Sequence, residues 1–272
     1  GFSEQYSSNF IAPFYGGITL DRSLSTSKRV FEYTFKALSD GDSAVPAEGM
    51  AAIPRQLATA AADAGATIQT GEAVTELTQK RRHAVVVTDN DRRAVDAVVV
   101  ATGPRQAARL TGCGSIPTDG VGCVTQHYRL PAADGLDTGR RLLLNAGDSA
   151  PNTVVPMSTV APEYAPDDGI LLNATFLGDD VVDIDSQQLA AKTRETLSAW
   201  YPDRQFDGLD PLRTDRIPFA QFAQPPGIHE SLPDVRDGGR RTYLAGEYTE
   251  WSSIQGAMES GRKAARAVVA DR

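Results

Sequence analysis

The sequence predicts an α+β protein in which an α/β part is interleaved with a part built from an antiparallel sheet and helices. Three observations carry this prediction. Residues 98–101 form a continuous apolar run, which is typical of a strand covered on both faces. Residues 186–200 have the apolar period of an amphipathic helix. Several strand candidates follow one another within residues 113–236.

Residues 1–47 contain few clear elements. Gly16 and Gly17 follow an aromatic stretch and precede the strand-like residues 18–20, so we expect a turn and then a short strand there. Residues 29–38 are compatible with either a helix or a strand.

Residues 48–112 predict the α/β part. An alanine-rich helix is followed by a strand that opens at Gly65, breaks at Gly71 and resumes. Residues 84–100 are predicted to form a hairpin and then the buried strand. That strand ends in Ala-Thr-Gly-Pro with Gly103, and ligands of open α/β sheets collect at the carboxyl ends of strands.

Residues 113–236 predict an antiparallel sheet backed by helices. The proline-rich residues 217–226 are expected either to border a substrate channel or to serve as a connector. The strand candidates are residues 122–128, 141–144, 152–160 and 169–176, and the helix candidate is residues 186–200.

Residues 237–272 predict a strand, a small-residue turn and a helix. From Ser253 onward, positions 254, 257, 258, 261, 265 and 268 lie on one face, by which we expect the helix to pack. Gly256 and Gly261 cost about 1 kcal/mol each relative to alanine, which indicates a close approach by a backbone or a flat ligand. Free N–H groups at the helix start favour an electron-rich partner. Glu247 can accept hydrogen bonds from hydroxyls of the same ligand.

This last segment resembles the C-terminal flavin motif of FAD oxidoreductases of the flavin amine oxidase and phytoene desaturase type. Residues 245–247 are similar to the family string AG(D/E), and residues 252–265 are similar to SI-x-GA-x-x-SGR-x-AA. The resemblance implies that Glu247 contacts the ribityl or diphosphate part of FAD, with the helix start at the pyrimidine edge of the ring system. The cofactor-binding residues that it implies here are Gly246, Glu247, Ile254, Gln255, Gly256 and Ala257.

Two earlier stretches carry the same resemblance. Residues 46–77 resemble a P-x-GGM turn, a helix and a strand, which implies that Val74 pairs through its backbone with the adenine end of FAD. Glu48 departs from the pattern, because the family commonly has glycine there. Residues 98–103 resemble the VVxAT strand end, which implies that Gly103 lies close to the dinucleotide.

By this resemblance, residues 1–47 and 113–236 form the substrate domain, and residues 48–112 and 237–272 belong to the FAD domain. The string G-x-G-x-x-G, which opens such a cofactor domain, does not occur in this sequence, and the chain starts without methionine. We therefore expect the C-terminal part of a longer flavoprotein, which by itself is inactive and binds FAD weakly or not at all.

Composition limits the partners. The net charge is −8, with 27 Lys and Arg against 35 Asp and Glu, so nucleic-acid binding is not expected. No apolar run reaches the roughly 18 residues of a membrane span, although peripheral membrane contact stays open. With no signal peptide visible, a cytoplasmic location is expected. Cys113 and Cys123 are too few for a disulfide scaffold and lack the spacing of metal ligands, so we expect no metal.

The expected reaction is oxidation or desaturation of a small hydrophobic or amine-bearing substrate by hydride transfer to flavin. Carotenoid-like, porphyrinogen-like and polyamine-like substrates all stay open, as do the electron acceptor and the oligomeric state. No catalytic residue is assigned, because His83, His127 and His229 each stand alone in the sequence. Trp251 is the best aromatic candidate for a pocket wall. The alternative function is a non-catalytic flavoprotein remnant that binds an apolar ligand or a partner chain.

Overall fold

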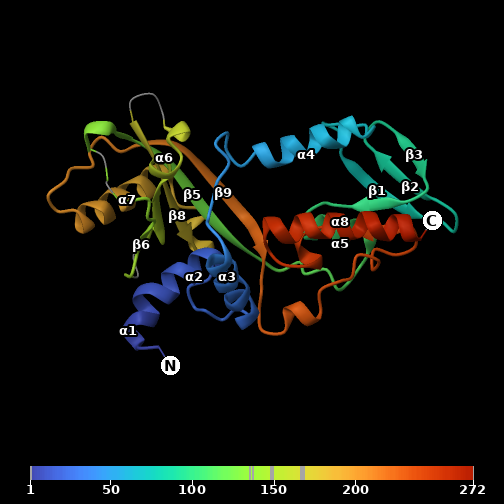
Figure 1. The fold of residues 1–272 in the computed structure, drawn as a ribbon, viewed down its shortest axis with the longest axis horizontal. Coiled ribbons are helices and arrows are strands. Elements are labelled where there is room, and N and C mark those ends of the chain that lie inside the picture. Colours follow the sequence, from blue (N-terminus) through green and yellow to red (C-terminus); the bar gives the residue numbers. More distant parts are fainter. Residues whose placement is uncertain (1, 135, 137, 148–149, 166–168, 272) are drawn as a thin grey trace. The chain divides into compact units, whose positions relative to one another are not determined.

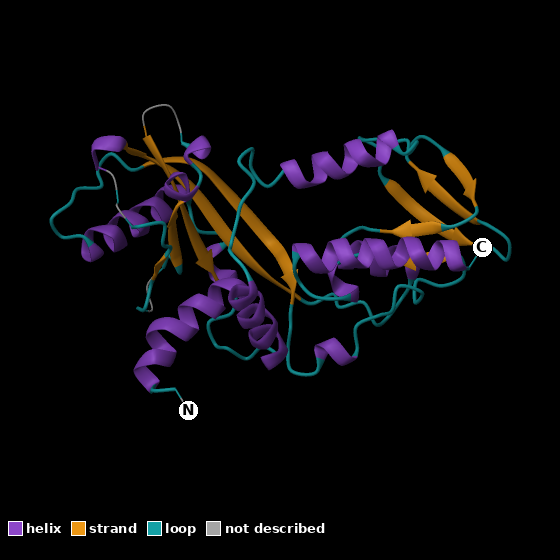
Figure 2. Cartoon of the chain, in the orientation of Figure 1, coloured by secondary structure: helices purple, strands orange, loops and turns teal. Residues whose placement is uncertain are grey.

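The computed structural model describes residues 2–134, 136, 138–147, 150–165 and 169–271 (Figures 1 and 2). Its helices are α1 (Glu4–Tyr6), η1 (Ser7–Ile11), α2 (Ala12–Thr19), α3 (Lys28–Asp40), α4 (Ala52–Asp63), α5 (Pro104–Thr111), η2 (Ala132–Asp134), α6 (Met157–Val160), η3 (Pro162–Tyr164), η4 (Asp179–Val181), α7 (Ser186–Trp200), η5 (Ile228–Glu230), η6 (Glu247–Thr249) and α8 (Ile254–Ala270). Its strands are β1 (Val74–Gln79), β2 (Ala84–Thr88), β3 (Arg92–Val95), β4 (Val98–Val100), β5 (Gly120–Pro131), β6 (Leu143–Leu144), β7 (Thr153–Pro156), β8 (Gly169–Leu177), β9 (Asp210–Phe222) and β10 (Thr242–Leu244). The mixture of helices with antiparallel and parallel strands confirms the predicted α+β class.

The chain divides into two compact units, each made of two separate segments. The first unit holds Gly1–Ala64 and Val121–Ala220, and the second holds Gly65–Gly120 and Gln221–Arg272. These boundaries differ from those of the four predicted segments, whose assignment to a cofactor domain and a substrate domain stays a prediction.

The first unit is built on a five-stranded sheet of order β6-β7-β8-β5-β9, in which β6, β7, β8 and β5 pair antiparallel (Figure 1). Burial alternates along β5 and β8, so one face of the sheet carries the core. Helix α7 covers that face and has the bounds that its amphipathic pattern predicts. The core includes Val124, Tyr128, Leu130, Leu172, Ala174, Phe176, Leu189 and Leu197.

A polar network crosses this core between β5 and α7. The Tyr128 hydroxyl donates to Gln126 Oε1 and lies 2.8 Å from Thr193 Oγ1. Gln126 Nε2 in turn donates to the Ser186 carbonyl at 3.0 Å and to Thr214 Oγ1 at 2.8 Å. Burial raises the pKa of Tyr128 to about 12, so the hydroxyl stays neutral. Because each buried polar group finds a partner, the network fixes α7 on the sheet at little cost.

The N-terminal helices correct one prediction. Gly16 and Gly17 lie inside α2, where a turn and a strand were expected. A Cβ atom on Gly16 would lie 2.9 Å from the Arg22 Cα, so glycine is needed for the returning chain to pass close to the helix. The helix ends at Thr19, and its C-cap residue Leu20 is left-handed with φ 59°. Residues 29–38 belong to helix α3.

The second unit contains two small sheets (Figure 2). Strands β1, β2 and β3 form an antiparallel meander, which includes the predicted hairpin. Strands β4 and β10 pair in parallel, with Val98, Val99 and Val100 opposite Thr242, Tyr243 and Leu244. The expectation that the β4 run is covered on both faces is wrong, since Val99 is 42% exposed.

Two further strand predictions and one interpretation of a proline-rich stretch need correction. The segment 65–73 is not a strand, and β1 starts only at Val74. The candidate at 152–160 is a strand only over Thr153–Pro156, because α6 follows and its Ser158 hydroxyl accepts the Leu171 N–H that a longer strand would bind. Much of the proline-rich stretch 217–226 belongs to β9.

Candidate functional site

Two parallel strands of the second unit end side by side. Strands β4 and β10 stop in register at Val100 and Leu244, and the Ala245 N–H donates to the Val100 carbonyl at 2.9 Å. Gly103 follows the first strand and starts α5, and Gly246 follows the second and starts η6. The structure therefore brings Gly103, Gly246 and Glu247 to one carboxyl edge, where α/β sheets bind ligands.

Gly246 is required at this edge for reasons of space. A Cβ atom there would lie 2.2 Å from the Tyr248 ring, and that ring is buried. The Gly246 N–H donates to Ser260 Oγ at 2.8 Å, which ties the turn to α8. Burial raises the pKa of Tyr248 to about 12, and its hydroxyl lies 3.4 Å from the Val100 carbonyl. The buried Tyr248 ring and the hydrogen bond to Ser260 therefore hold this edge in place.

Glu247 is half-buried and already has a partner within the chain. The Ser252 hydroxyl donates to Glu247 Oε2 at 2.9 Å and lies 3.2 Å from Gln221 Oε1. Burial raises the pKa of the Glu247 carboxyl, and the Ser252 hydrogen bond offsets part of that rise. A carboxylate that is partly desolvated in this way is a strong acceptor for ligand hydroxyls.

The first turn of α8 faces outward, apart from one residue. Ser253 caps the helix, because its hydroxyl accepts the Gly256 N–H at 2.9 Å. Ile254, Gln255 and Ala257 are exposed. Gly256 instead points inward, where a Cβ atom would lie 2.1 Å from the Trp251 carbonyl oxygen. The close approach of the Trp251 backbone thus explains why residue 256 is glycine. A direct contact of Gly256 with a cofactor stays a prediction.

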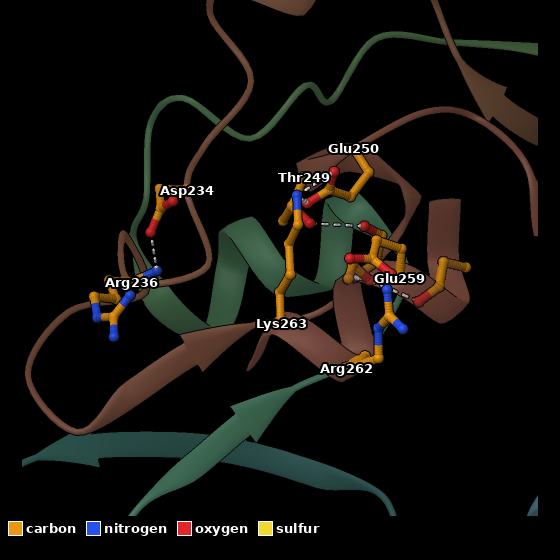
Figure 3. Close-up of polar contacts among 10 residues, drawn as sticks. Asp234, Arg236, Thr249, Glu250, Glu259, Arg262 and Lys263 are labelled. Carbon is orange, nitrogen blue, oxygen red and sulfur yellow. Dashed lines mark hydrogen bonds and ion pairs between the residues drawn. The ribbon is translucent and has the colours of Figure 1, made fainter. Parts of the chain in front are cut away.

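An ion pair fixes the loop before this helix. Figure 3 shows the Lys263 side chain extending from α8 to Glu250, and Lys263 Nζ donates to the two Glu250 oxygens at 2.7 and 2.8 Å. The Glu250 side chain is only 15% exposed, so the pair is shielded on one side. It holds the η6 turn against the middle of α8.

The predicted packing face of α8 is wrong. Ile254 and Met258 are each 49% exposed, and a Cβ atom on Gly261 would meet nothing within 4 Å. The buried residues are smaller, namely Gly256, Ser260, Ala264 and Ala267. They allow the helix to approach the buried Tyr243 and Ala245 closely. These small residues recur at intervals of three or four residues, which also marks one face of a helix. The larger apolar residues on the other face had indicated the wrong packing face.

Val74 does not join the other predicted residues at the strand ends. It starts β1, and its neighbour Thr75 accepts a hydrogen bond at 3.1 Å from Arg109 Nη1 in the last turn of α5. Gly103 caps the opposite end of that helix. Val74 therefore lies near the far end of α5, on a separate sheet.

Two histidines have partners that the sequence did not reveal. In the first unit, His127 Nε2 lies 3.1 Å from Asp215 Oδ2 and its Nδ1 lies 2.9 Å from Asn173 Oδ1. Hydrogen bonding to Arg213, and then to His127, holds the pKa of Asp215 below its ordinary value. In the second unit, the His229 ring lies 4.4 Å from that of Trp251. These contacts assign no catalytic role to either histidine.

Glu247→Gln should raise the unfolding midpoint at neutral pH. The folded-state pKa of Glu247 lies above that of the unfolded chain, so ionisation opposes folding once the pH exceeds the folded-state pKa. The gain should shrink as the pH falls through the folded-state pKa and be lost below about 4, where the carboxyl becomes protonated in both states. Thermal unfolding from about pH 3 to 8 measures this dependence.

The matched control is Glu259→Gln on α8. Glu259 pairs with Arg262 on the surface (Figure 3), so its removal should leave the midpoint unchanged or lower it slightly. A stabilisation by Glu247→Gln that is equal at all pH values would show that ionisation of Glu247 is not its cause.

Comparison with known proteins identifies the relationship. The profile of the family described as flavin containing amine oxidoreductase matches residues 1–269. No curated protein matches the sequence significantly. Among the described residues, no helix is long and apolar enough to cross a membrane.

Three solved structures illustrate the fold. An oxidoreductase from Methanosarcina mazei is 16% identical with a TM-score of 0.74, and the match covers 99% of this chain and 65% of that one. A putative protoporphyrinogen oxidase from Exiguobacterium sp. 255-15 is 13% identical with a TM-score of 0.58, covering 74% and 47%. Cyclohexylamine oxidase from Brevibacterium oxydans IH-35A is 17% identical with a TM-score of 0.55, covering 73% and 48%. The match spans between 47% and 65% of these three chains. With the profile match over nearly the whole sequence, the chain belongs to the flavin-containing amine oxidoreductase family.

Proposed function

We propose that this chain forms the C-terminal part of an FAD-dependent oxidoreductase that oxidises or desaturates a small hydrophobic or amine-bearing substrate. The observation that carries the proposal is the shared carboxyl edge of β4 and β10, where Gly103, Gly246 and Glu247 meet in a chain of the flavin-containing family. The similarity to cyclohexylamine oxidase supports a substrate of this kind. A cytoplasmic location stays a prediction.

The edge is suited to a dinucleotide such as FAD. A Cβ atom on Gly103 would meet nothing within 4 Å, so a ligand can approach the backbone there. The exposed first turn of α8 presents helix N–H groups, which favour an electron-rich group through the helix dipole. Glu247 supplies an acceptor for ribityl or ribose hydroxyls. Flavin, when bound, accepts the hydride, and these residues would hold and orient it.

Val74 is proposed to bind the adenine end of the cofactor through its backbone. In support, β1 lies at the edge of its sheet and has β2 as its one neighbour among the described strands. Alternate N–H and C=O groups along the other side of an edge strand are open to a ligand. Arg109 already uses one of them at Thr75.

The first test is a titration of FAD with the purified 272-residue chain, followed by flavin fluorescence. We expect saturable but weak quenching, because the sequence contains no glycine-rich phosphate loop. Circular dichroism must show in parallel that the chain is folded. A folded chain without quenching would show that the proposed contacts do not suffice for FAD binding without a phosphate loop, and the upstream gene sequence would then distinguish part of a flavoprotein from a remnant that binds an apolar ligand or a partner chain.

Glu247→Gln should weaken FAD binding by about 1–3 kcal/mol, the contribution of a charge-assisted hydrogen bond. Glu259→Gln, five residues beyond Ile254 on α8, should leave the affinity unchanged. Since Glu247→Gln is expected to stabilise the free protein, weaker binding by this variant cannot be ascribed to unfolding. Equal affinities of both variants and the parent chain would remove Glu247 from the site.

A further inference from the structure

The N-terminal helices of the first unit carry an unbroken succession of aromatic rings. Each ring lies against the next, with centroid distances between 4.8 and 5.9 Å. Two of the steps are nearly parallel stacks, with interplanar angles of 9° and 14°. In order along the succession, the residues are Phe2, Tyr6, Phe10, Phe14, Tyr15, Phe31 and Phe35.

A π-helical turn accounts for the alignment of the first four rings. They recur every four residues, and in an α-helix each such step overshoots a full turn by about 40°. Between α1 and α2 the chain forms the π-helix η1, in which the Ala12 N–H donates to the Ser7 carbonyl. This wider turn rotates less per residue and so offsets the drift. π-helical turns are rare in proteins, and those that occur often lie at functional sites.

The rings line a groove of about 510 Å³ between the N-terminal helices and α3. This volume falls within the range of small-molecule sites, about 300–1,000 Å³. Ile11, Leu38 and Ser39 complete the lining, and no charged side chain is among the lining residues. The Ser39 hydroxyl is used within α3, where it donates to the Phe35 carbonyl at 2.8 Å. Burial, and then the nearby Tyr6, raises the pKa of Tyr15, so that hydroxyl is also neutral.

One end of the groove is anchored and the other is open. Tyr15 is 6% exposed, and the preceding turn of α2 is held to the sheet by Asn152 Nδ2, which donates to the Pro13 carbonyl at 3.0 Å. Phe2 and Phe35 are 65% and 57% exposed. Large apolar side chains gathered in this way mark an interaction site.

We propose that this groove binds an elongated, uncharged molecule with an aromatic or conjugated skeleton. A flat π surface packs against aromatic rings in the offset or edge-to-face geometry that aromatic pairs prefer, so it suits the ring atoms that line the groove. A charged ligand would lose its hydration without gaining a partner, since the lining holds no ion of either sign. The net charge of −8 on the chain disfavours an anionic membrane surface as the occupant. The site lies wholly within the first unit and does not depend on flavin.

The test uses diphenylhexatriene, a neutral conjugated rod that fluoresces in apolar surroundings, with the 272-residue chain and no FAD. We expect saturable binding at one site. Its propionic acid derivative carries a carboxylate on the same skeleton and should bind at least about tenfold more weakly. Hexadecanol, which is long and uncharged but saturated, should displace the probe poorly.

Two substitutions locate the site. Phe35→Ser and Phe10→Ser should each weaken binding of diphenylhexatriene by about tenfold. Phe35 is largely exposed, so its truncation leaves the fold intact, which circular dichroism checks. The control is Leu57→Ser on α4, where an equally exposed apolar side chain lies outside the groove. Equal affinity of all three variants and the parent chain would overturn the proposal.

Two other occupants would also overturn it. If the parent chain is a dimer that Phe35→Ser converts to a monomer, and no probe binds, the aromatic face is a contact between copies. If the chain floats with neutral phosphatidylcholine vesicles but binds no free probe, the face is a membrane contact.

Discussion

Gly256→Ala should destabilise the second unit by about 3 kcal/mol, the upper range for a group forced into a filled space. The added methyl would lie 2.1 Å from the Trp251 carbonyl oxygen and 3.0 Å from the backbone N and C atoms of that residue. Backbone atoms cannot rotate away as a side chain can. The start of α8 would have to move, and the turn that carries Glu247 would move with it.

The measurement can be confined to one unit. The chain has two tryptophans, Trp200 in the first unit and Trp251 in the second, so Trp200→Phe leaves a single reporter for the second. Urea unfolding followed by tryptophan fluorescence then gives the free energy of unfolding. Gly261→Ala is the matched control on the same helix, and it should stabilise by about 0.5–1 kcal/mol because the site is open. Effects of the same sign would show that the close contact at Gly256 is not the cause.

Phe176→Ala should destabilise the first unit by about 3–5 kcal/mol. The Phe176 side chain is fully buried on the face of β8 that α7 covers, so its removal leaves a cavity in the main core. Trp200 is partly buried against the same core. Its fluorescence in a Trp251→Phe background therefore reports unfolding of this unit.

Thr175→Ala is the control for the sheet orientation. Thr175 precedes Phe176 on β8, lies on the opposite face and is paired with Thr125 and Thr153 across the neighbouring strands. Its substitution should cost less than about 1 kcal/mol. Similar losses for both variants would mean that the two faces of β8 are equally packed, contrary to the alternation of burial.

The sequence predicted most reliably the elements whose own pattern decides their structure. Residues 186–200 alternate apolar and polar side chains with the helical period, and α7 has those bounds. The hairpin around residues 84–95 has a polar turn after the β-branched run 85–88, and β2 and β3 pair there. In both cases local pattern and tertiary packing agree.

Other elements depend on tertiary contacts that the pattern does not contain. Pro211 and Pro218 argue against a central strand, yet β9 is the last strand in the sheet order, where proline is tolerated. In α8, the apolar Ile254 and Met258 suggested the packing face, whereas close approach to the sheet selects the small residues on another face. Hydrophobicity alone ranks these two faces in the wrong order.

In the candidate site, the sequence predicted the backbone elements but not the side-chain contacts between them. The string around Gly246 and Glu247 indicated a strand end and a helix start, and the structure has both. Two contacts depend on how the turn folds, so the spacing of residues could not identify them. Ser252 donates a hydrogen bond to Glu247, and the Tyr248 ring packs against Gly246. The flavin roles of these residues stay predictions until binding is measured.

The division of each unit into two segments has a consequence for how the chain folds during its synthesis. Strand β4 pairs with β10, and the Val100 carbonyl meets a Tyr248 hydroxyl 148 residues away in sequence. The second segment of the first unit therefore leaves the ribosome before the partner of β4 exists. Contacts between such distant segments form slowly, and an apolar strand with open edges is prone to aggregate meanwhile. The nascent chain should therefore depend on slow expression or on chaperones until β10 and α8 have been synthesised.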